Sequence, residues 1–444
     1  MSIAMGTRIS WMVALSTVIV LVAAPVQAQW PQWGGPNRSF TAECKPLADH
    51  WPEGGPRQLW SRELGDGYSS LICDDDVLFT MYRKNMDDET EYTVALDAAT
   101  GKTLWEQAHS APVGEPPDRR WGGNGPNSTP LIVKDRLYSV GSTRMLRCFE
   151  KKTGKVLWEQ DLAQGYEGAF ERGAGYSPSP IAYKNLIIVA FDPQKPRTGE
   201  DEHVEPEVNV PHETRTRIEG RTMMAFDQLT GKPVWRNLDF WFDFSSPILI
   251  RFADRDQIVA CSRSGLFAID PSNGDLLWHH PKLGGVHTPV WDGVDSIVFP
   301  SQHERGVQLT LESGRIVPVE RWEQRKLDFI QATPVRIGDL FIGSSQQNLI
   351  AGDWKTGKRL WLKRNYPFAI TIAADGKLLT LDQNGFLKLL RVSRDGAEVL
   401  GECKPLERYS YATPALAGDT LYLRDRKTIL ALDLGRPQQA QAQP

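Results

Sequence analysis

Short runs of alternating apolar residues recur along the chain, and most of them end at an acidic residue followed by a glycine turn. The first complete copy spans residues 97–105 (DAATGKTLW) and places Trp105 four residues after Gly101. Apolar alternation predicts a β-strand, and Thr-Gly-Lys predicts a tight turn because glycine readily takes φ > 0. Each copy therefore predicts a β-hairpin with a tryptophan on the outgoing strand, where its large side chain packs on a neighbouring unit.

The hairpin pattern repeats, with two degenerate copies. Complete copies occupy 97–105, 150–158, 227–235, 270–278 and 353–361. Two copies lack the tryptophan: Pro318 follows Gly314, and Leu400 follows Gly396, at the expected position. The outgoing strands with tryptophan predict structural docking residues at Trp60, Trp105, Trp158, Trp235, Trp278 and Trp361.

A second pattern predicts how many units there are. Short segments rich in Ser, Thr and Pro open the units, at 128–130, 179–180, 246–247, 288–289, 333–334 and 413–414, with weaker members at 68–70 and 368–370. A β run follows each segment, which gives four strands per unit and eight units of roughly 40–45 residues. The sequence therefore predicts an all-β, eight-bladed β-propeller of four-stranded antiparallel blades.

The two ends of the repeat predict how the ring closes. The last strand, 429–433, has no tryptophan strand after it, whereas the strand around Trp60 has no unit before it. If this N-terminal strand pairs on the outside of the last blade, both exposed edges disappear.

These residues resemble the pyrroloquinoline-quinone-like propeller repeat family, whose motif is Ala-x-Asp-x-x-x-Gly-x-x-x-Trp. Copies beginning at Ala95, Ala225 and Ala268 match the motif fully. The opening 30–38 (WPQWGGPNR) is similar to the start of exported bacterial members. The resemblance implies a propeller and leaves the activity open, because the family contains quinoprotein dehydrogenases as well as non-enzymatic lipoproteins of outer-membrane assembly.

Charge and the N-terminus predict the compartment. The formal net charge is -4 and no long basic run occurs, which argues against a nucleic-acid partner. Arg8, the apolar run 11–24 and the small residues before Gln29 predict a signal peptide over 1–28, with an uncleaved signal anchor as the alternative. We expect a single propeller over 29–435 with a charged insertion at 192–220, a flexible tail over 436–444, no transmembrane span in the mature chain, and export to the periplasm or the cell exterior.

The five cysteines do not form a disulfide framework, because their number is odd and they are sparse. Glu-Cys-Lys-Pro-Leu occurs around both Cys44 and Cys403. Free thiols are the favoured interpretation, and a Cys44–Cys403 bridge is the alternative.

Uneven loop lengths predict where a ligand binds. If the strands run from A at the axis to D at the rim, the D–A and B–C connections share one face. The long connections at 83–91, 107–127, 161–176, 192–220 and 236–243 then lie on that face over blades 1–4, and binding tends to concentrate in such loops. The candidate ligand contacts at the axial funnel are Arg119, Arg120, Trp121, Asn124, Asn127, Glu171, Arg172, Tyr176, Asp243, His287, Gln331, Arg408 and Tyr409. The alternative is that these side chains satisfy the loops and one another.

Two functions of different classes remain. The first is a non-catalytic binding or scaffold module of the cell envelope, with a protein or small-molecule ligand on the long-loop face. The alternative, implied by the resemblance, is a dehydrogenase of alcohols or sugars that uses pyrroloquinoline quinone and calcium. The chain has no adjacent cysteines and no haem-attachment motif, and it is short for such an enzyme. It also lacks the lipid-attachment cysteine of the assembly lipoproteins. Catalytic residues and metal ligands are not predicted, and the binding module is favoured.

Overall fold

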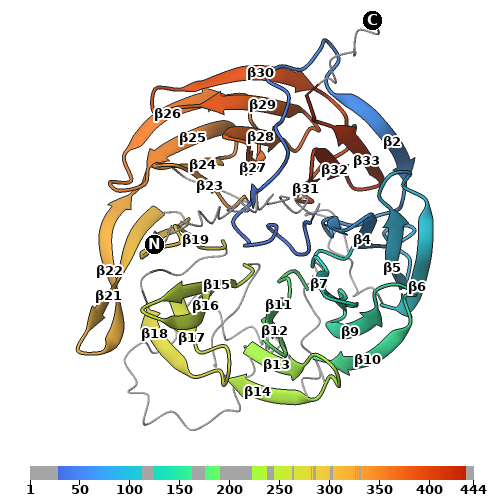
Figure 1. Cartoon of the computed structure of the whole chain (residues 1–444), viewed down its shortest axis with the longest axis horizontal. Coiled ribbons are helices and arrows are strands. Elements are labelled where there is room, and N and C mark those ends of the chain that lie inside the picture. Colours follow the sequence, from blue (N-terminus) through green and yellow to red (C-terminus); the bar gives the residue numbers. More distant parts are fainter. Residues whose placement is uncertain are drawn as a thin grey trace, which may run out of the picture.

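A computed structural model describes residues 29–112, 125–162, 176–190, 223–237, 245–262, 265–281, 283, 287–300, 304–325, 327, 329 and 332–436. Within these ranges the chain forms eight sheets, each with four antiparallel strands, arranged as the blades of a propeller (Figure 1). The predicted eight-bladed fold is confirmed. No helix in the described ranges is long and apolar enough to cross a membrane.

Blades 1 to 4 follow the chain from axis to rim. Blade 1 contains β3 (Ile72–Asp74), β4 (Val77–Tyr82), β5 (Thr90–Asp97) and β6 (Thr103–Ser110). Blade 2 contains β7 (Leu131–Val133), β8 (Arg136–Val140), β9 (Met145–Glu150) and β10 (Val156–Asp161). Blade 3 contains β11 (Ile181–Tyr183), β12 (Leu186–Ala190), β13 (Met223–Asp227) and β14 (Pro233–Asn237). Blade 4 contains β15 (Ile248–Phe252), β16 (Arg255–Ser262), β17 (Gly265–Ile269) and β18 (Leu276–His280).

Blades 5 to 8 complete the ring. Blade 5 contains β19 (Val290–Trp291), β20 (Ser296–Phe299), β21 (Glu304–Glu312) and β22 (Arg315–Gln324). Blade 6 contains β23 (Val335–Ile337), β24 (Leu340–Ser344), β25 (Asn348–Asp353) and β26 (Arg359–Arg364). Blade 7 contains β27 (Ile370–Ala374), β28 (Lys377–Leu381), β29 (Leu387–Val392) and β30 (Ala397–Cys403), and β1 (Thr41–Ala42) is added at its axial edge. Blade 8 contains β31 (Ala415–Ala417), β32 (Thr420–Arg424), β33 (Thr428–Asp433) and the N-terminal strand β2 (Arg57–Glu63).

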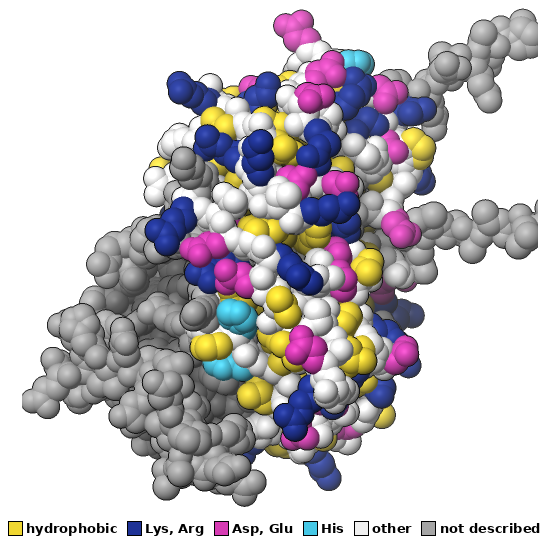
Figure 2. All heavy atoms as spheres, turned by 90° about the vertical axis from the view of Figure 1, so that its left-hand side faces the viewer, with side chains coloured by type: hydrophobic (Ala, Val, Ile, Leu, Met, Phe, Trp, Pro, Cys, Tyr) yellow, Lys and Arg dark blue, Asp and Glu magenta, His cyan; other side chains and the backbone are white. Residues whose placement is uncertain are grey.

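Burial follows position within a blade. The middle strands are almost wholly buried, as in β12, whereas the outer strand β6 alternates between exposed and half-buried residues. The core therefore lies between the faces of neighbouring blades. On the side of the rim shown in Figure 2, positive, negative and hydrophobic side chains are interspersed.

Ring closure by an N-terminal strand is also confirmed. Strand β2 pairs antiparallel with β33, and Arg57 lies opposite Asp433. In Figure 1 the blue strand β2 lies beside the red strands of the last blade. Buried Arg424 reinforces this seam between blades 8 and 1, because it donates to Ser69 O at 2.8 Å and Met81 O at 2.8 Å.

The rim tryptophans bridge consecutive blades. Four of them share one geometry, in which indole Nε1 donates to a carbonyl in the C–D turn of the next blade, at 2.9–3.2 Å, and the ring covers the turn glycine. These pairs are Trp60 with Gly101, Trp105 with Gly154, Trp158 with Gly231 and Trp235 with Gly274. Their contribution to stability stays a prediction.

The other two predicted tryptophans depart from this geometry. Trp278 Nε1 donates to Gln257 Oε1 within its own blade, at 2.8 Å. Trp361 Nε1 reaches Ser393 O of blade 7, at 2.9 Å, but no atom would lie within 4 Å of a Cβ at Gly396.

Blade 5 has its docking tryptophan at a position that the sequence pattern missed. Trp322, not Pro318, covers the turn glycine of the next blade, Gly357, and donates from Nε1 to Trp354 O at 3.1 Å. The reason is that β21 and β22 extend to a two-residue turn at 313–314, so counting four residues from Gly314 stops short. Pro318 instead lies in β22, opposite Leu309.

Blade 7 obtains its tryptophan from elsewhere in the chain. A bulge in β30 places Gly401, not Leu400, at the position that Trp105 holds in blade 1. Trp51 of the N-terminal segment fills the space, since a Cβ at Gly401 would lie 2.7 Å from the Cβ of Trp51. Trp51 is 9% exposed, and its backbone N–H donates to Leu400 O at 3.3 Å.

All five cysteines carry free thiols in the structure, which agrees with the favoured interpretation. Burial raises the pKa of Cys44 and of Cys403 to about 11 in each case. Cys403 lies against Gly55, whereas Cys44 is close to Asp375.

Candidate functional site on the propeller axis

The Ser/Thr-Pro segments form a belt of hydrogen bonds around the axis. In each of five consecutive-blade pairs, a backbone N–H donates to the Ser or Thr hydroxyl of the neighbouring blade. The donor and acceptor residues are Ser70 to Thr129 at 3.3 Å, Thr129 to Ser179 at 3.1 Å, Ser179 to Ser246 at 3.0 Å, Ser246 to Thr288 at 3.1 Å, and Thr413 to Ser70 at 2.9 Å. The sequence pattern marked these residues as strand openers and missed this role, although their recurrence at one place in each blade was the signal.

An N-terminal segment, 30–42, crosses the axis, which the sequence did not predict. Trp30 forms a β-bridge with Cys73 of blade 1, and Pro31 O accepts the Ile132 N–H of blade 2 at 2.8 Å. At its other end, β1 pairs in parallel with β27 of blade 7. In Figure 1 the blue chain runs from the rim to the centre of the ring.

Arg38 is the charged group of this segment at the axis. It is 3% exposed, and its guanidinium donates to Pro247 O at 3.0 Å, to Ser179 O at 3.4 Å and to Pro180 O. Its Nε donates to Gln32 Oε1 at 3.0 Å. Burial lowers the pKa of Arg38 to about 9. The guanidinium thus binds carbonyl groups of blades 3 and 4, and few of its N–H donors remain for a ligand.

Two of the predicted ligand contacts lie on the face with the D–A and B–C connections, hereafter the loop face. Tyr409 is 60% exposed and stacks on Tyr411 with ring centroids 6.3 Å apart, and Tyr411 meets Tyr68 at 5.5 Å. Arg408 next to them donates its N–H to Asp425 Oδ2 at 3.2 Å. The structure thereby brings together an exposed tyrosine cluster, Tyr68, Tyr409 and Tyr411, of which the sequence identified one member.

Three further candidates are placed by the structure. Tyr176 is 4% exposed and donates to Ala190 O at 2.6 Å, which puts it in the core between blades 2 and 3. His287 is half-buried and burial lowers its pKa, while Asn127 is half-buried directly before the belt. The candidates Arg119, Arg120, Trp121, Asn124, Glu171, Arg172, Asp243 and Gln331 lie outside the described residues, as do most of the long connections.

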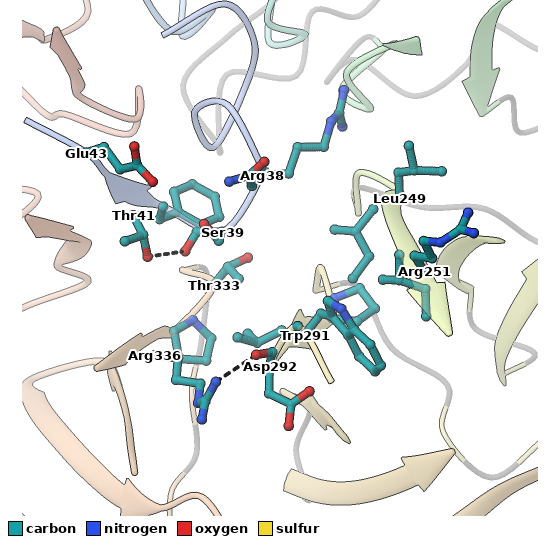
Figure 3. Close-up of a pocket in the computed structure, with 18 of the residues that line it drawn as sticks. Arg38, Ser39, Thr41, Glu43, Leu249, Arg251, Trp291, Asp292, Thr333 and Arg336 are labelled. Atoms are coloured by element: carbon teal, nitrogen blue, oxygen red, sulfur yellow. Dashed lines mark hydrogen bonds between the residues drawn. The ribbon is translucent and has the colours of Figure 1, made fainter. Parts of the chain in front are cut away.

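A cavity of about 510 Å³ opens beside the axis, between residues 37–43 and the inner strands of blades 4, 5 and 6. We call it the axial cavity. Figure 3 shows Ser39, Thr41 and Glu43 on one side of it and Leu249 and Trp291 on the other. Sequence reasoning missed this site, because residues distant in the chain form it.

The described axial residues do not fit a quinone and calcium centre. Calcium needs several converging oxygen ligands, and no group of three or more His, Cys, Asp or Glu side chains suited to a metal occurs among the described residues. The segment with Arg38 and the hydroxyl belt occupy the axis instead. We therefore derive no chemical step through such a cofactor.

Comparison with known proteins identifies the family. A family model described as outer membrane protein assembly factor BamB matches residues 51–200 and 89–361. The curated outer membrane protein assembly factor BamB of Moranella endobia (strain PCIT) is 22% identical over 278 residues, which are 58% of this chain and 62% of that protein. The match thus spans less than two thirds of the relative's own length.

Solved structures are similar at low identity. The computationally designed Ika8 protein has a TM-score of 0.57 and 10% identity, over 85% of this chain and 99% of that chain. The quinohemoprotein alcohol dehydrogenase of Comamonas testosteroni has a TM-score of 0.49 and 16% identity, over 93% of this chain and 81% of that chain. At 10% identity the first likeness shows the propeller fold alone. Because the family model covers well over half of the chain and the repeats form the expected blades, the chain belongs to the pyrroloquinoline-quinone-like β-propeller family described as outer membrane protein assembly factor BamB.

Proposed function

We propose that this chain is a non-catalytic binding module of the cell envelope that holds a protein partner and assists the assembly of outer-membrane proteins. The relatives are named for that assembly role, and the predicted signal peptide supports export. The observation on the chain itself that carries the proposal is the exposed tyrosine cluster on the loop face.

The tyrosine cluster has the composition of a protein-binding surface. Tyrosine and arginine are enriched in such interfaces, since their side chains combine large contact area with a polar group. Tyr409 and Tyr411 are 60% and 37% exposed, although large aromatic residues gain free energy on burial. Arg408 borders them, and its guanidinium lies 3.9 Å from Glu63 in an exposed pair that a partner could readily displace.

The partner surface extends, in this proposal, from the tyrosine cluster towards the long connections of blades 1–4. From the order of the strands, we expect those connections on the same face as Tyr68 and Tyr409. The alternative quinone-dependent dehydrogenase gains no specific support from the described residues.

The proposal is tested in the native host by deleting the gene and restoring it with variants. We expect deletion to lower the amount of folded outer-membrane β-barrel protein, measured by heat-modifiable migration of envelope fractions on gels. The double variant Tyr409→Ala/Tyr411→Ala should restore it poorly while retaining the wild-type Tm, because only exposed side chains change.

Leu104→Ala is the matched control, because Leu104 is a 53% exposed apolar residue on the outer strand of blade 1. It should restore folding fully. Unchanged β-barrel levels after deletion would refute the assembly role, and full restoration by the tyrosine double variant would refute this surface.

A further inference from the structure

The axial cavity exists because the N-terminal segment covers the axis unevenly. The segment pairs with the inner strands of blades 1, 2 and 7 through its backbone, and with blades 3 and 4 through Arg38. Within the described residues, no hydrogen bond joins it to β19 or β23 of blades 5 and 6. The inner sides of these two blades therefore remain open and form one wall of the cavity.

The wall made by the N-terminal segment presents polar groups beside the ring of Phe40. Ser39 and Thr41 contribute hydroxyl groups, and Glu43 contributes an exposed carboxylate that forms no ion pair with another described residue. Thr333 adds a hydroxyl from blade 6. Unlike the belt hydroxyls, Thr333 Oγ1 accepts no N–H from a neighbouring blade in the described ranges. The Thr41 hydroxyl donates to Ser39 O at 3.4 Å and is left as an acceptor, and the other groups are available for short hydrogen bonds to a ligand.

The opposite wall presents two large apolar side chains. Leu249 of β15 and Trp291 of β19 line it (Figure 3). Pro289 and Pro334 also line the cavity. Trp291 is half-buried and has the largest apolar side chain of this wall. A ligand that fits must therefore carry hydrogen-bonding groups on one side and an apolar surface on the other.

The charges around the cavity disfavour an anionic ligand. Arg251 is paired with Asp256 at 2.9 Å and Asp254 at 3.5 Å. Arg336 donates to Asp292 O at 2.8 Å and lies over the ring of Trp354. Since the guanidinium of Arg38 is bound to blades 3 and 4, each of the three cations of the lining has at least one partner, although Nε of Arg336 is buried without one. An anionic ligand would face the carboxylates of Glu43 and Asp292.

We propose that the axial cavity binds the ring of a small neutral carbohydrate. A pyranose has hydroxyl groups around its edge and an apolar face of C–H groups, so it matches both walls. The Trp291 indole contacts the apolar face, while Glu43 and the hydroxyl of Thr333 bind ring hydroxyls. A volume of about 510 Å³ lies in the usual range for small-molecule sites, roughly 300–1,000 Å³.

This site goes beyond the proposed function and is separate from its surface. The cavity is lined by the A–B turns at Gly293 and Gly338, whereas the tyrosine cluster lies on the loop face. Loss of carbohydrate binding therefore need not alter outer-membrane protein assembly, and the two proposals fail independently.

The test is isothermal titration of the purified mature chain with glucose, N-acetylglucosamine and maltose, and with sorbitol as an acyclic control. We expect ring sugars to bind with a Kd of about 1 mM or tighter. Sorbitol should bind at least about tenfold more weakly, because it has the hydroxyl groups without the rigid apolar face.

Variants locate the site. Trp291→Ala should weaken sugar binding about tenfold or more, and Thr333→Val, which keeps the side-chain shape, should weaken it several-fold. Glu43→Gln should act like Thr333→Val and serves if Trp291→Ala fails to fold. Thr103→Val, on the outer strand of blade 1, should leave the affinity unchanged.

Three results would overturn the proposal. These are an absence of binding by all three ring sugars, equal binding of sorbitol and glucose, and wild-type affinity in both Thr333→Val and Glu43→Gln. Binding of an extended peptide without any sugar binding would likewise assign the cavity to another class of ligand.

Discussion

The indole of Trp105 lies so close over Gly154 of the next blade that a Cβ at Gly154 would come within 2.5 Å of the ring. Gly154 also has φ +74°, which side-chain-bearing residues rarely adopt. Gly154→Ala should therefore lower the free energy of unfolding by about 2 kcal/mol or more, measured by urea denaturation.

Gly396→Ala is the control that has neither the ring contact nor the positive φ. Gly396 occupies the corresponding turn of blade 7, but an added Cβ would have no atom within 4 Å there. We expect this variant to stay within about 0.5 kcal/mol of the wild type. Equal losses in the two variants would contradict the role assigned to the tryptophan contact.

Trp51 should be necessary for a stable seam between blades 7 and 8. It fills the place where blade 7 lacks its own tryptophan and is 9% exposed. Trp51→Ala should cost about 3–5 kcal/mol, as for other buried large-to-small changes, with a corresponding fall in Tm by calorimetry. Leu104→Ala on the rim should leave Tm nearly unchanged, and an unaltered Tm in Trp51→Ala would show that the seam does not depend on this side chain.

The hydroxyl belt makes a prediction for Thr129. Thr129→Val keeps the shape of the side chain but removes the acceptor for the Ser70 N–H. A buried donor left without a partner costs about 1–3 kcal/mol, so chemical denaturation should show a loss of that size. For comparison, Thr103→Val removes an exposed hydroxyl that accepts from Arg62 at 3.1 Å, where water can replace it, and should cost about 0.5 kcal/mol or less. Similar values for both variants would argue against the belt.

His109 should make the stability of the chain depend on pH. Burial, followed by the nearby Arg147, lowers the pKa of His109 to about 3, and the ring also contacts Thr93 Oγ1 at 3.0 Å and Phe149. The unfolded chain binds a proton at this site below about pH 6.5, whereas the folded chain does not. The neutral ring therefore makes its full contribution to the free energy of unfolding above pH 6.5. This contribution declines as the pH falls towards 3, by on the order of a few kcal/mol.

The measurement is the free energy of unfolding of the wild type and of His109→Gln between pH 7 and pH 4. Subtracting the two profiles removes the carboxylate titrations that both proteins share. The wild type should lose more stability on acidification than the variant does, and parallel profiles would contradict the assignment.

The sequence by itself determined the repeat, the eight blades and the closure of the ring. Each of these follows from regularities that can be read along the chain. Apolar alternation specifies the strands and glycine specifies the turns. The first strand has no blade before it and the last blade lacks an outer strand, so the two are identified as partners. The spacing from the turn glycine did not locate the tryptophan where a longer hairpin or a bulge altered the register of the strands. The extended hairpin moved the tryptophan of blade 5 to Trp322, and the bulge in β30 put Gly401 where Leu400 was expected.

Only the tertiary structure decided what lies on the axis. Residues 30–42 carry no repeat pattern, and their partners lie in blades separated from them by tens to hundreds of positions, as Arg38 and Pro247 show. Trp51 likewise packs at Gly401 of blade 7, which lies far from it along the chain. The axial cavity, the hydroxyl belt and the tyrosine cluster all arise from side chains that only the closure of the ring brings together, because each blade alone contributes one or two of them.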